Sequence, residues 1–369
     1  MLDALRPAIA SAALLLSLAT ATAQAQISPQ LSQQIKDVLE NAADNEKPSA
    51  QQVVPGLELR VYRSADNALV FSHKAGNFNP AAAIEIASAT KWVTAATFMA
   101  LVTDGKLRLD STTREVLGWE GAAGAITLDQ LLSFTSQINE HFCALNKRSS
   151  LEACAQQIFN VTRNKRFRGN EYAYGAAAFT VAGRMAEIAT GMKWVDIFDK
   201  YMRQPLGMSA QVDYWGLWAD GAPTDNPSLD GGLRLTVDDY ARFMQMIDDK
   251  GVHNGRRIIR ADLVENMERS RFQHPIRLKS HPATALGYPH FEYGLGNWVE
   301  CQAPRQCQNA VNSSEGAFGY YPWIDRQSGY YAILAMKGNN RGSQQGGSKR
   351  SATTVGILQP ALNQAFAGN

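Results

Sequence analysis

The sequence predicts an α/β protein whose sheet is built from both ends of the chain, with a mainly helical segment between them. Residues 56–62 alternate apolar and polar side chains, and residues 68–72 repeat the alternation after a turn, which is typical of a β-hairpin. Runs at 318–324 and 330–336 flank a second turn at 325–329 and predict a second hairpin. Residues 109–249 show mostly helical spacing, interrupted by Gly, Pro and Asn. Strands at both ends with helices between them favour one sheet carrying a helical insertion.

Three further elements complete this prediction. Apolar positions at helical spacing predict a helix within 30–50, and a strongly apolar run predicts a second helix from Ser88 to about Asp104, closed by Gly105. Residues 337–349 are rich in Gly, Asn, Gln and Ser, so we expect an exposed loop before a short final helix. The predicted domains are an α/β sandwich from 26–107 with 250–369, and a mainly helical domain over 108–249.

Length and charge narrow the possible functions. A chain of 369 residues is long enough for two or three structural units and a deep pocket. Lys and Arg number 36 against 34 Asp and Glu, so no basic surplus favours nucleic acid as a partner. Apolar residues at 45% are ordinary for a folded soluble protein and too frequent for a disordered one.

The first 25 residues resemble an export signal. A weakly basic start at Arg6 leads into an apolar stretch near 9–18 and then into Ala23-Gln24-Ala25, which predicts cleavage before Gln26. The apolar stretch is shorter than the ~20 residues that span a bilayer, so we expect no stable membrane insertion after cleavage. The sequence therefore predicts a periplasmic or secreted protein.

The chain contains four cysteines, at 143, 154, 301 and 307. An even number in two local pairs suits two disulfides in an oxidising compartment, with zinc ligation and free buried thiols as the alternatives. Zinc is disfavoured because no C-x-x-C or H-x-x-x-H spacing accompanies either pair. Pairing 143–154 with 301–307 is the choice with the shortest loops, although sequence alone does not determine connectivity.

The pattern Ser88-Ala-Thr-Lys91, at the start of the apolar helix, suggests a serine nucleophile with a lysine base. Positions i and i+3 share a helix face, so the Lys91 amine can reach the Ser88 hydroxyl and help remove its proton. The positive end of the helix dipole favours negative charge developing there. The pattern is short, and a helix cap followed by a surface lysine would produce the same letters.

The surrounding segments resemble the serine β-lactamase-like hydrolases, in particular the branch of class C β-lactamases, family VIII carboxylesterases and D-alanyl-D-peptidases. The matching segments, in order, are 88–91 (SATK), 126–136 (ITLDQLLSFTS), 205–208 (PLGM), 229–243 (LDGGLRLTVDDYARF) and 254–259 (NGRRII). The resemblance implies a β-lactamase/transpeptidase-like fold, with an antiparallel sheet flanked by helices and the site beside a mainly helical domain. It also implies that the reaction passes through an acyl-enzyme on Ser88, and it implies no metal or organic cofactor.

The family's second motif, Y-x-N, corresponds to residues 174–176. The resemblance places the catalytic tyrosine at Tyr174, with Tyr172 as the alternative, and a phenol there could pass a proton from nucleophile to leaving group. The asparagine of the motif is replaced by Ala176, which removes an amide that contacts substrate in β-lactamases.

The third motif, K-T-G or H-x-G in the family, corresponds to Ser314-Glu315-Gly316. The cation that would hold a β-lactam or peptide carboxylate is absent; Ser314 offers a neutral hydrogen bond, and Glu315 would repel an anion if it faced the pocket. By resemblance, the backbone N–H groups of Ser88 and Ala317 form the oxyanion hole.

Aromatic residues near 214–218 complete the predicted site. Trp215 and Trp218 are hypothesised to line an apolar acyl or alcohol pocket, with plain core packing as the alternative. The function favoured by these residues is an exported serine hydrolase that acts on a small ester or amide. The alternatives are a D-alanyl-D-peptidase or weak class C-like β-lactamase, and a non-catalytic member that binds peptidoglycan or a protein.

Overall fold

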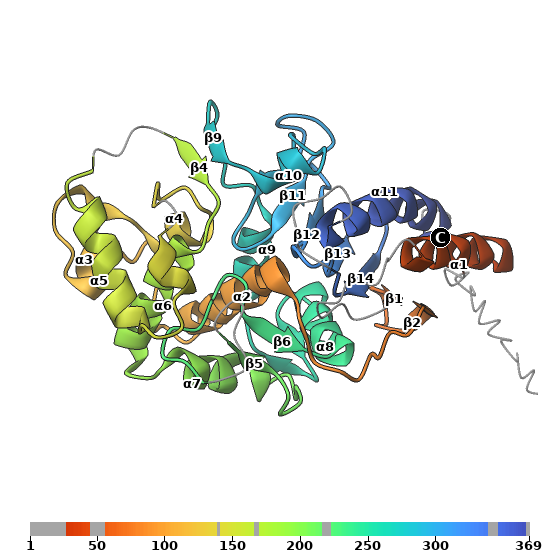
Figure 1. Ribbon diagram of the computed structural model, residues 1–369, viewed down its shortest axis with the longest axis horizontal. Coiled ribbons are helices and arrows are strands. Elements are labelled where there is room, and N and C mark those ends of the chain that lie inside the picture. The colour runs from red at the N-terminus through yellow and green to blue at the C-terminus, as the bar shows by residue number, and fades with distance from the viewer. Residues whose placement is uncertain are drawn as a thin grey trace, which may run out of the picture.

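A seven-stranded antiparallel sheet is the main element of the computed structural model, which describes residues 27–44, 56–138, 141–165, 170–215, 223–338 and 346–366 (Figure 1). The strand order is β10-β11-β12-β13-β14-β1-β2. These strands are β1 (Leu57–Arg63), β2 (Leu69–Ala75), β10 (Glu292–Tyr293), β11 (Trp298–Glu300), β12 (Val311–Ser313), β13 (Tyr321–Asp325) and β14 (Tyr330–Met336).

The two ends of the chain meet in the middle of this sheet, as the sequence predicts. β1 pairs with β14 along its whole length, with Leu57 opposite Met336 and Arg63 opposite Tyr330. Both predicted hairpins form, as β1–β2 and β13–β14. The second begins later than predicted, because Gly319 donates a turn hydrogen bond to the Gly316 carbonyl and residues 316–319 form a turn before β13.

Helices cover both faces of the sheet (Figure 1). On one face α1 (Pro29–Asp44) and α11 (Gly347–Phe366) lie against each other and bury alternate strand residues such as Trp323 and Leu334. The other face buries the intervening residues, such as Ile324 and Ile333, in the larger core cluster. The predicted helix at 30–50 is confirmed for Pro29–Asp44, and residues 45–55 lie outside the described part. The final helix spans 20 residues and is longer than predicted.

The remaining helices lie mostly between β2 and β10 in the chain. The α-helices are α2 (Thr90–Thr103), α3 (Thr113–Leu117), α4 (Leu128–Leu132), α5 (Leu151–Thr162), α6 (Ala177–Thr190), α7 (Trp194–Phe198), α8 (Val237–Asp248), α9 (Ala261–Glu268) and α10 (Pro282–Ala285). Shorter turns of helix are η1 (Ala87–Ala89), η2 (Gly121–Ala125), η3 (Phe142–Leu145) and the π-helical η4 (Asp199–Arg203). Threonines at 112, 127 and 236 begin α3, α4 and α8 with capping boxes.

Short strands connect the helical part to the sheet. β3 (Ile84–Glu85), β6 (Leu233–Leu235) and β5 (Asp213–Tyr214) form a three-stranded sheet in that order. Two further pairs are β4 (Glu171–Ala173) with β9 (Arg277–Ser280), and β7 (Val252–His253) with β8 (Arg256–Arg257). β3 leads directly into η1 and therefore fixes the start of the predicted nucleophile helix.

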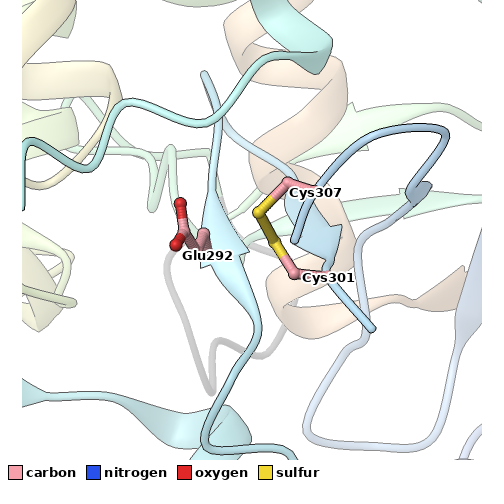
Figure 2. Close-up of side chains that lie close together, drawn as sticks. All are labelled: Glu292, Cys301 and Cys307. Atoms are coloured by element: carbon pink, nitrogen blue, oxygen red, sulfur yellow. A yellow bond between two sulfur atoms is a disulfide. The ribbon is translucent and has the colours of Figure 1, made fainter. Parts of the chain in front are cut away.

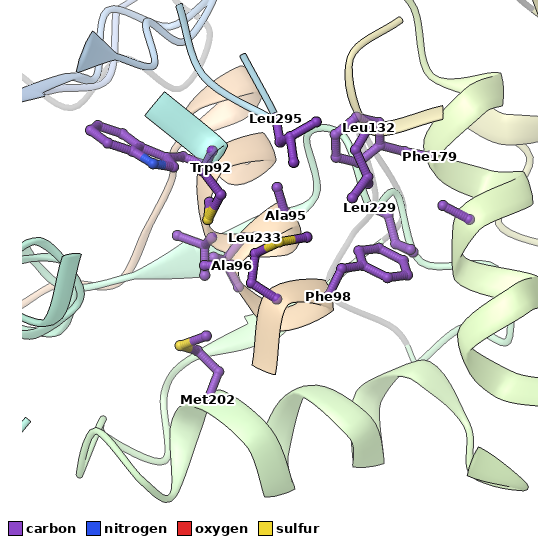
Figure 3. Packing of buried hydrophobic residues seen from close by; sticks show 14 of the residues in the cluster. Trp92, Ala95, Ala96, Phe98, Leu132, Phe179, Met202, Leu229, Leu233 and Leu295 are labelled. Carbon is purple, nitrogen blue, oxygen red and sulfur yellow. The ribbon is translucent and has the colours of Figure 1, made fainter. Parts of the chain in front are cut away.

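Helix α2 occupies the centre of the larger core, and its side chains are buried on every side, which marks it as an interior helix (Figure 3). It is surrounded by side chains from α4, α6, η4, β6 and the segment before β11: Leu132, Phe179, Met202, Leu233 and Leu295. A helix held on all sides offers a rigid base for the residues at its N-terminus.

Two predictions about chain organisation remain predictions. The signal peptide at 1–25 lies outside the described residues, and no helix within the described ranges combines the length and apolarity needed to cross a bilayer. The domain boundaries at 107/108 and 249/250 likewise stay predictions.

Candidate active site

Ser88 lies in η1, at the turn between β3 and α2. The preceding residue, Ala87, has φ +47°, in the left-handed region that non-glycine residues seldom adopt. Such strained backbone persists where its surroundings impose it, and it is concentrated at functional sites. Here Gly316 packs directly against the turn, because a Cβ at that position would overlap the Ile86 carbonyl oxygen. The two segments predicted to form the oxyanion hole are therefore in contact.

Lys91 contacts the hydroxyl of Ser88. Its ammonium nitrogen lies 3.1 Å from Ser88 Oγ, as the i, i+3 spacing predicts. It also donates to the Asp230 carbonyl oxygen at 2.7 Å and lies 3.3 Å from Asp230 Oδ2. The Lys91 side chain is 1% exposed, so these contacts replace its hydration.

Asp230 is the site residue that sequence reasoning missed. It is held by Ser228, whose hydroxyl donates to Asp230 Oδ1 at 2.7 Å, while Oδ2 faces Lys91. Asp230 lies 139 residues from Lys91 in the chain, so local spacing could not reveal the contact. A carboxylate directly before the Gly231-Gly232 pair is the one sequence signal that could have identified it.

Tyr174 completes the cluster on the other side of Lys91. The lysine nitrogen lies 4.5 Å from the centroid of the Tyr174 ring, within the range of a cation–π contact. The ring stacks on Trp298 with centroids 5.7 Å apart and packs against Phe134 at 4.7 Å. The Tyr174 N–H donates to the Ser280 carbonyl, so β9 also holds its backbone.

The alternative tyrosine, Tyr172, is placed differently. It is fully buried, packs against Phe134, Phe272 and Trp298, and its hydroxyl has no hydrogen-bond partner among the described residues. Tyr174 is thus the tyrosine of this pair that contacts Lys91.

The charges of the cluster are set by burial and by one another. Burial lowers the pKa of Lys91, but Tyr174 and Asp230 outweigh this effect and leave the pKa above its ordinary value. Burial raises the pKa of Tyr174, and Lys91 and Ser88 only partly reverse this effect. The resting site therefore combines an ammonium group paired with a carboxylate, a neutral phenol and a serine hydroxyl.

The third motif lies against the serine. Ser314 donates its hydroxyl to the Ser88 carbonyl oxygen at 3.2 Å, which ties the end of β12 to η1. The N–H of Ala317, in the following turn, donates to no group within the described residues. Both segments assigned to the oxyanion hole are thus present side by side, with the Ala317 donor unengaged.

Glu315, the second residue of the third motif, is not the simple anion that the sequence suggests. Its side chain is buried, and burial raises its pKa to about 8, against partial lowering by Ser348 and Lys91. At neutral pH the carboxyl group is mostly protonated, so it adds little negative charge to the site.

The predicted pocket residues are only partly described. Ala176 is buried at the start of α6 and offers no polar side chain. Trp215 stacks on the Arg234 guanidinium at 3.7 Å and donates its indole N–H to Asp213 at 2.7 Å. Trp218 lies outside the described residues. A role for Trp215 in lining an acyl pocket stays a prediction.

Both disulfides form with the shortest-loop connectivity, Cys143–Cys154 and Cys301–Cys307. Figure 2 shows Glu292 beside the second of these. The Glu292 carboxylate and the two sulfur atoms lie within 4.8 Å of one another, but the sulfurs are bonded to each other and are not thiolate ligands. Glu292 is also engaged by His274 at 2.7 Å.

Comparisons with known proteins identify the family of this chain. A family model described as Beta-lactamase matches residues 35–352, which is most of the chain. This chain belongs to the beta-lactamase family. The matched range spans Ser88, Lys91, Tyr174 and the third motif, and the fold is the β-lactamase/transpeptidase-like fold that the sequence predicts.

Three relatives illustrate the range of this beta-lactamase family. "Penicillin-binding protein 4" of Amycolatopsis lactamdurans is 27% identical over 209 residues, 47% of this chain and 53% of the relative, so the match spans about half of that protein's length. The structure of a putative beta-lactamase from Bacteroides dorei DSM 17855 is 28% identical, with a TM-score of 0.73, over 91% of this chain and 98% of that one. EstCE1, a hydrolase with promiscuous acyltransferase activity, is 15% identical with a TM-score of 0.65, over 88% and 98% of the two chains, and shows the shared fold alone.

Proposed function

We propose that this chain is a serine hydrolase that forms an acyl-enzyme on Ser88 and acts on uncharged carboxylic esters or simple amides. The observation that carries the proposal is the part-buried Ser88–Lys91 contact of 3.1 Å, with the lysine nitrogen over the Tyr174 ring. A serine needs a base to become nucleophilic, and this cluster supplies two groups that can exchange its proton.

In the proposed reaction, Ser88 Oγ attacks the substrate carbonyl while its proton passes to the Lys91–Tyr174 pair. The N–H groups of Ser88 and Ala317 stabilise the oxyanion, and the pair returns the proton to the leaving alcohol or amine. Water then attacks the acyl-enzyme and releases the acid. Because Lys91 is an ammonium group at rest, we expect the rate to rise with pH as its neutral fraction grows.

The preference for uncharged substrates rests on the third motif and on the pairing of Lys91. A substrate carboxylate would need a cation, and Ser314 and a mostly protonated Glu315 provide none. Lys91, the cation of the cluster, already faces the Asp230 carboxylate.

A D-alanyl-D-peptidase or weak β-lactamase is the second candidate, because the curated relative in the comparison is a penicillin-binding protein. We further propose that residues 1–25 direct export to the periplasm or medium, where the two disulfides would form.

Intact-protein mass spectrometry after treatment with a fluorophosphonate probe tests these assignments. We expect one adduct on the wild-type chain and on the control Ser149→Ala, no adduct on Ser88→Ala, and no adduct with penicillin. Adducts with both reagents would favour the peptidase or β-lactamase. No adduct with either, in folded protein, would refute the hydrolase and favour a binding role.

A further inference from the structure

A cavity of about 900 Å³ lies between α11 and the strands β11–β13. It is on the face of the sheet covered by α1 and α11, because its lining includes Tyr321, which packs in that core cluster. Helix α2, which carries the catalytic lysine, packs in the cluster on the opposite face. The cavity is therefore separate from the proposed active site. Its volume is within the range of small-molecule sites.

Helix α11 turns a polar stripe toward this cavity. Gln359, Asn363 and Gln364 form this stripe at helical spacing, and Val355, Gly356 and Pro360 line the cavity beside them. Leu358, Leu362 and Phe366 are buried against the sheet. A helix packed on a sheet normally keeps its polar residues on the solvent side. Here part of the polar face is opposed by the protein, across a space large enough for a ligand.

Hydrogen bonds to other side chains of the protein orient the amide groups of Gln359 and Asn363. Asn363 Oδ1 accepts from the Tyr330 hydroxyl at 2.7 Å, and Gln359 Nε2 donates to Glu300 at 3.1 Å. Glu300 also accepts from the Tyr321 hydroxyl at 2.8 Å. These contacts leave the side-chain NH₂ group of Asn363 and the side-chain oxygen Oε1 of Gln359 without hydrogen-bond partners among the described residues. A donor group and an acceptor are thus held in place and available to a ligand.

An aromatic surface forms one end of the cavity. Tyr288 and Phe291 stack with centroids 4.7 Å apart and an angle of 11° between the ring planes. Tyr288 donates to the Ala352 carbonyl at 3.2 Å, and Gly356 allows this approach, since a Cβ there would lie 3.1 Å from the tyrosine oxygen. The Cys301–Cys307 disulfide closes the loop at the rim.

The charges of the lining residues disfavour an anionic ligand. Glu300 and Asp325 line the cavity, and no Lys or Arg does so among the described residues. Both carboxyl groups are engaged internally, Glu300 as above and Asp325 by Ser328 at 2.8 and 2.9 Å. His290 is the basic side chain among the described lining residues, and no Lys or Arg accompanies it, so an anion would find no permanent positive charge. A neutral ligand with groups that both donate and accept fits best.

We propose that this cavity binds a neutral saccharide, with hydroxyl groups paired to Gln359 and Asn363 and a ring face near Tyr288. Each sugar hydroxyl can accept from the Asn363 amide and donate to the Gln359 carbonyl, and the aromatic pair covers the apolar face of a ring. This site goes beyond the proposed hydrolase activity and does not depend on it.

The test uses the full Ser88→Ala chain with maltotriose, cellotriose and N-acetylchitotriose as separate probes. Saturation-transfer NMR and calorimetry are expected to detect at least one of them, with Kd below about 1 mM. Gln359→Leu and Asn363→Leu should each weaken that binding at least tenfold. The control Gln156→Leu, at an exposed position of α5, should leave it unchanged.

Thermal unfolding verifies that each variant is folded. If Asn363→Leu unfolds because Tyr330 loses its partner, Gln364→Leu, on the outer edge of the stripe, replaces it and should weaken binding at least threefold. Failure of all three sugars to bind would overturn the proposal. So would binding that the stripe variants leave intact, or binding that disappears in wild-type protein labelled on Ser88 by fluorophosphonate.

Discussion

Replacing Glu315 with glutamine should raise the free energy of unfolding at pH 8 and leave it nearly unchanged at pH 5. The Glu315 side chain is 9% exposed, and its Oε1 has no hydrogen-bond partner among the described residues. Burial raises its pKa from 4.5 to about 8, although Ser348 and Lys91 act in the opposite direction. The folded protein therefore keeps a proton that the unfolded chain releases near pH 4.5.

The size of the effect follows from this difference in pKa. Between pH 4.5 and pH 8 the folded state binds more protons than the unfolded state, so the free energy of unfolding falls as pH rises. The loss is about 1.4 kcal/mol per pH unit within this window. Between pH 5 and pH 8 it amounts to about 3–4 kcal/mol. Glutamine cannot ionise, so Glu315→Gln escapes this loss.

Urea unfolding followed by circular dichroism, with the disulfides intact, measures the difference. We expect wild type and Glu315→Gln to unfold at similar urea concentrations at pH 5, and the variant to be more stable by about 3 kcal/mol at pH 8. Glu120→Gln, at an exposed position, is the control and should show no such change. An equal gap at both pH values would refute the reasoning, because it would mean that Glu315 ionises alike in the folded and unfolded chains.

Three further predictions concern the site and its support. Asp230→Asn keeps a polar group beside Lys91 but removes the negative charge, so the pKa of Lys91 should fall. The rising limb of kcat/KM against pH should then move to lower pH. An unchanged pH profile would contradict the role given to Asp230. Gly316→Ala should lower stability by about 1–3 kcal/mol and lower ester hydrolysis, since a methyl group overlaps the turn before the serine, and both can be measured on one purified sample. Replacing both Cys143 and Cys154 with alanine opens a loop with a sequence separation of 11 and should cost about 3 kcal/mol in urea unfolding, with no loss of Ser88 labelling in the folded variant.

The parts of this site that the sequence could predict are those set by local geometry or by the family pattern. One turn of helix places Ser88 near Lys91, and the family spacing selects Tyr174 over Tyr172. The hairpins and the helices at both ends follow from residue periodicity, and the short loops suggested the disulfide pairs.

The remaining features arise from tertiary packing between segments that are distant in the sequence. Asp230 reaches Lys91 across 139 residues of chain, and the left-handed φ of Ala87 is unexpected for alanine. Glu315 was predicted only as an anion, because its burial and its interactions with Lys91 and Ser348 arise from the tertiary structure. The final helix is longer than predicted because the polar residues that face the cavity beside α11 interrupt its apolar pattern.

The pairing of β1 with β14 has a consequence for biosynthesis. Leu57 emerges from the ribosome about 280 residues before its partner Met336, so the sheet lacks its central pairing until nearly the whole chain has been made. Contacts between such distant segments form slowly. Ser314 and Gly316, which lie against the serine turn, also arrive late. A nascent chain therefore completes the surroundings of Ser88 late, and a chain cut short before Tyr330 would carry Ser88 and Lys91 without the strand β14 that pairs with β1.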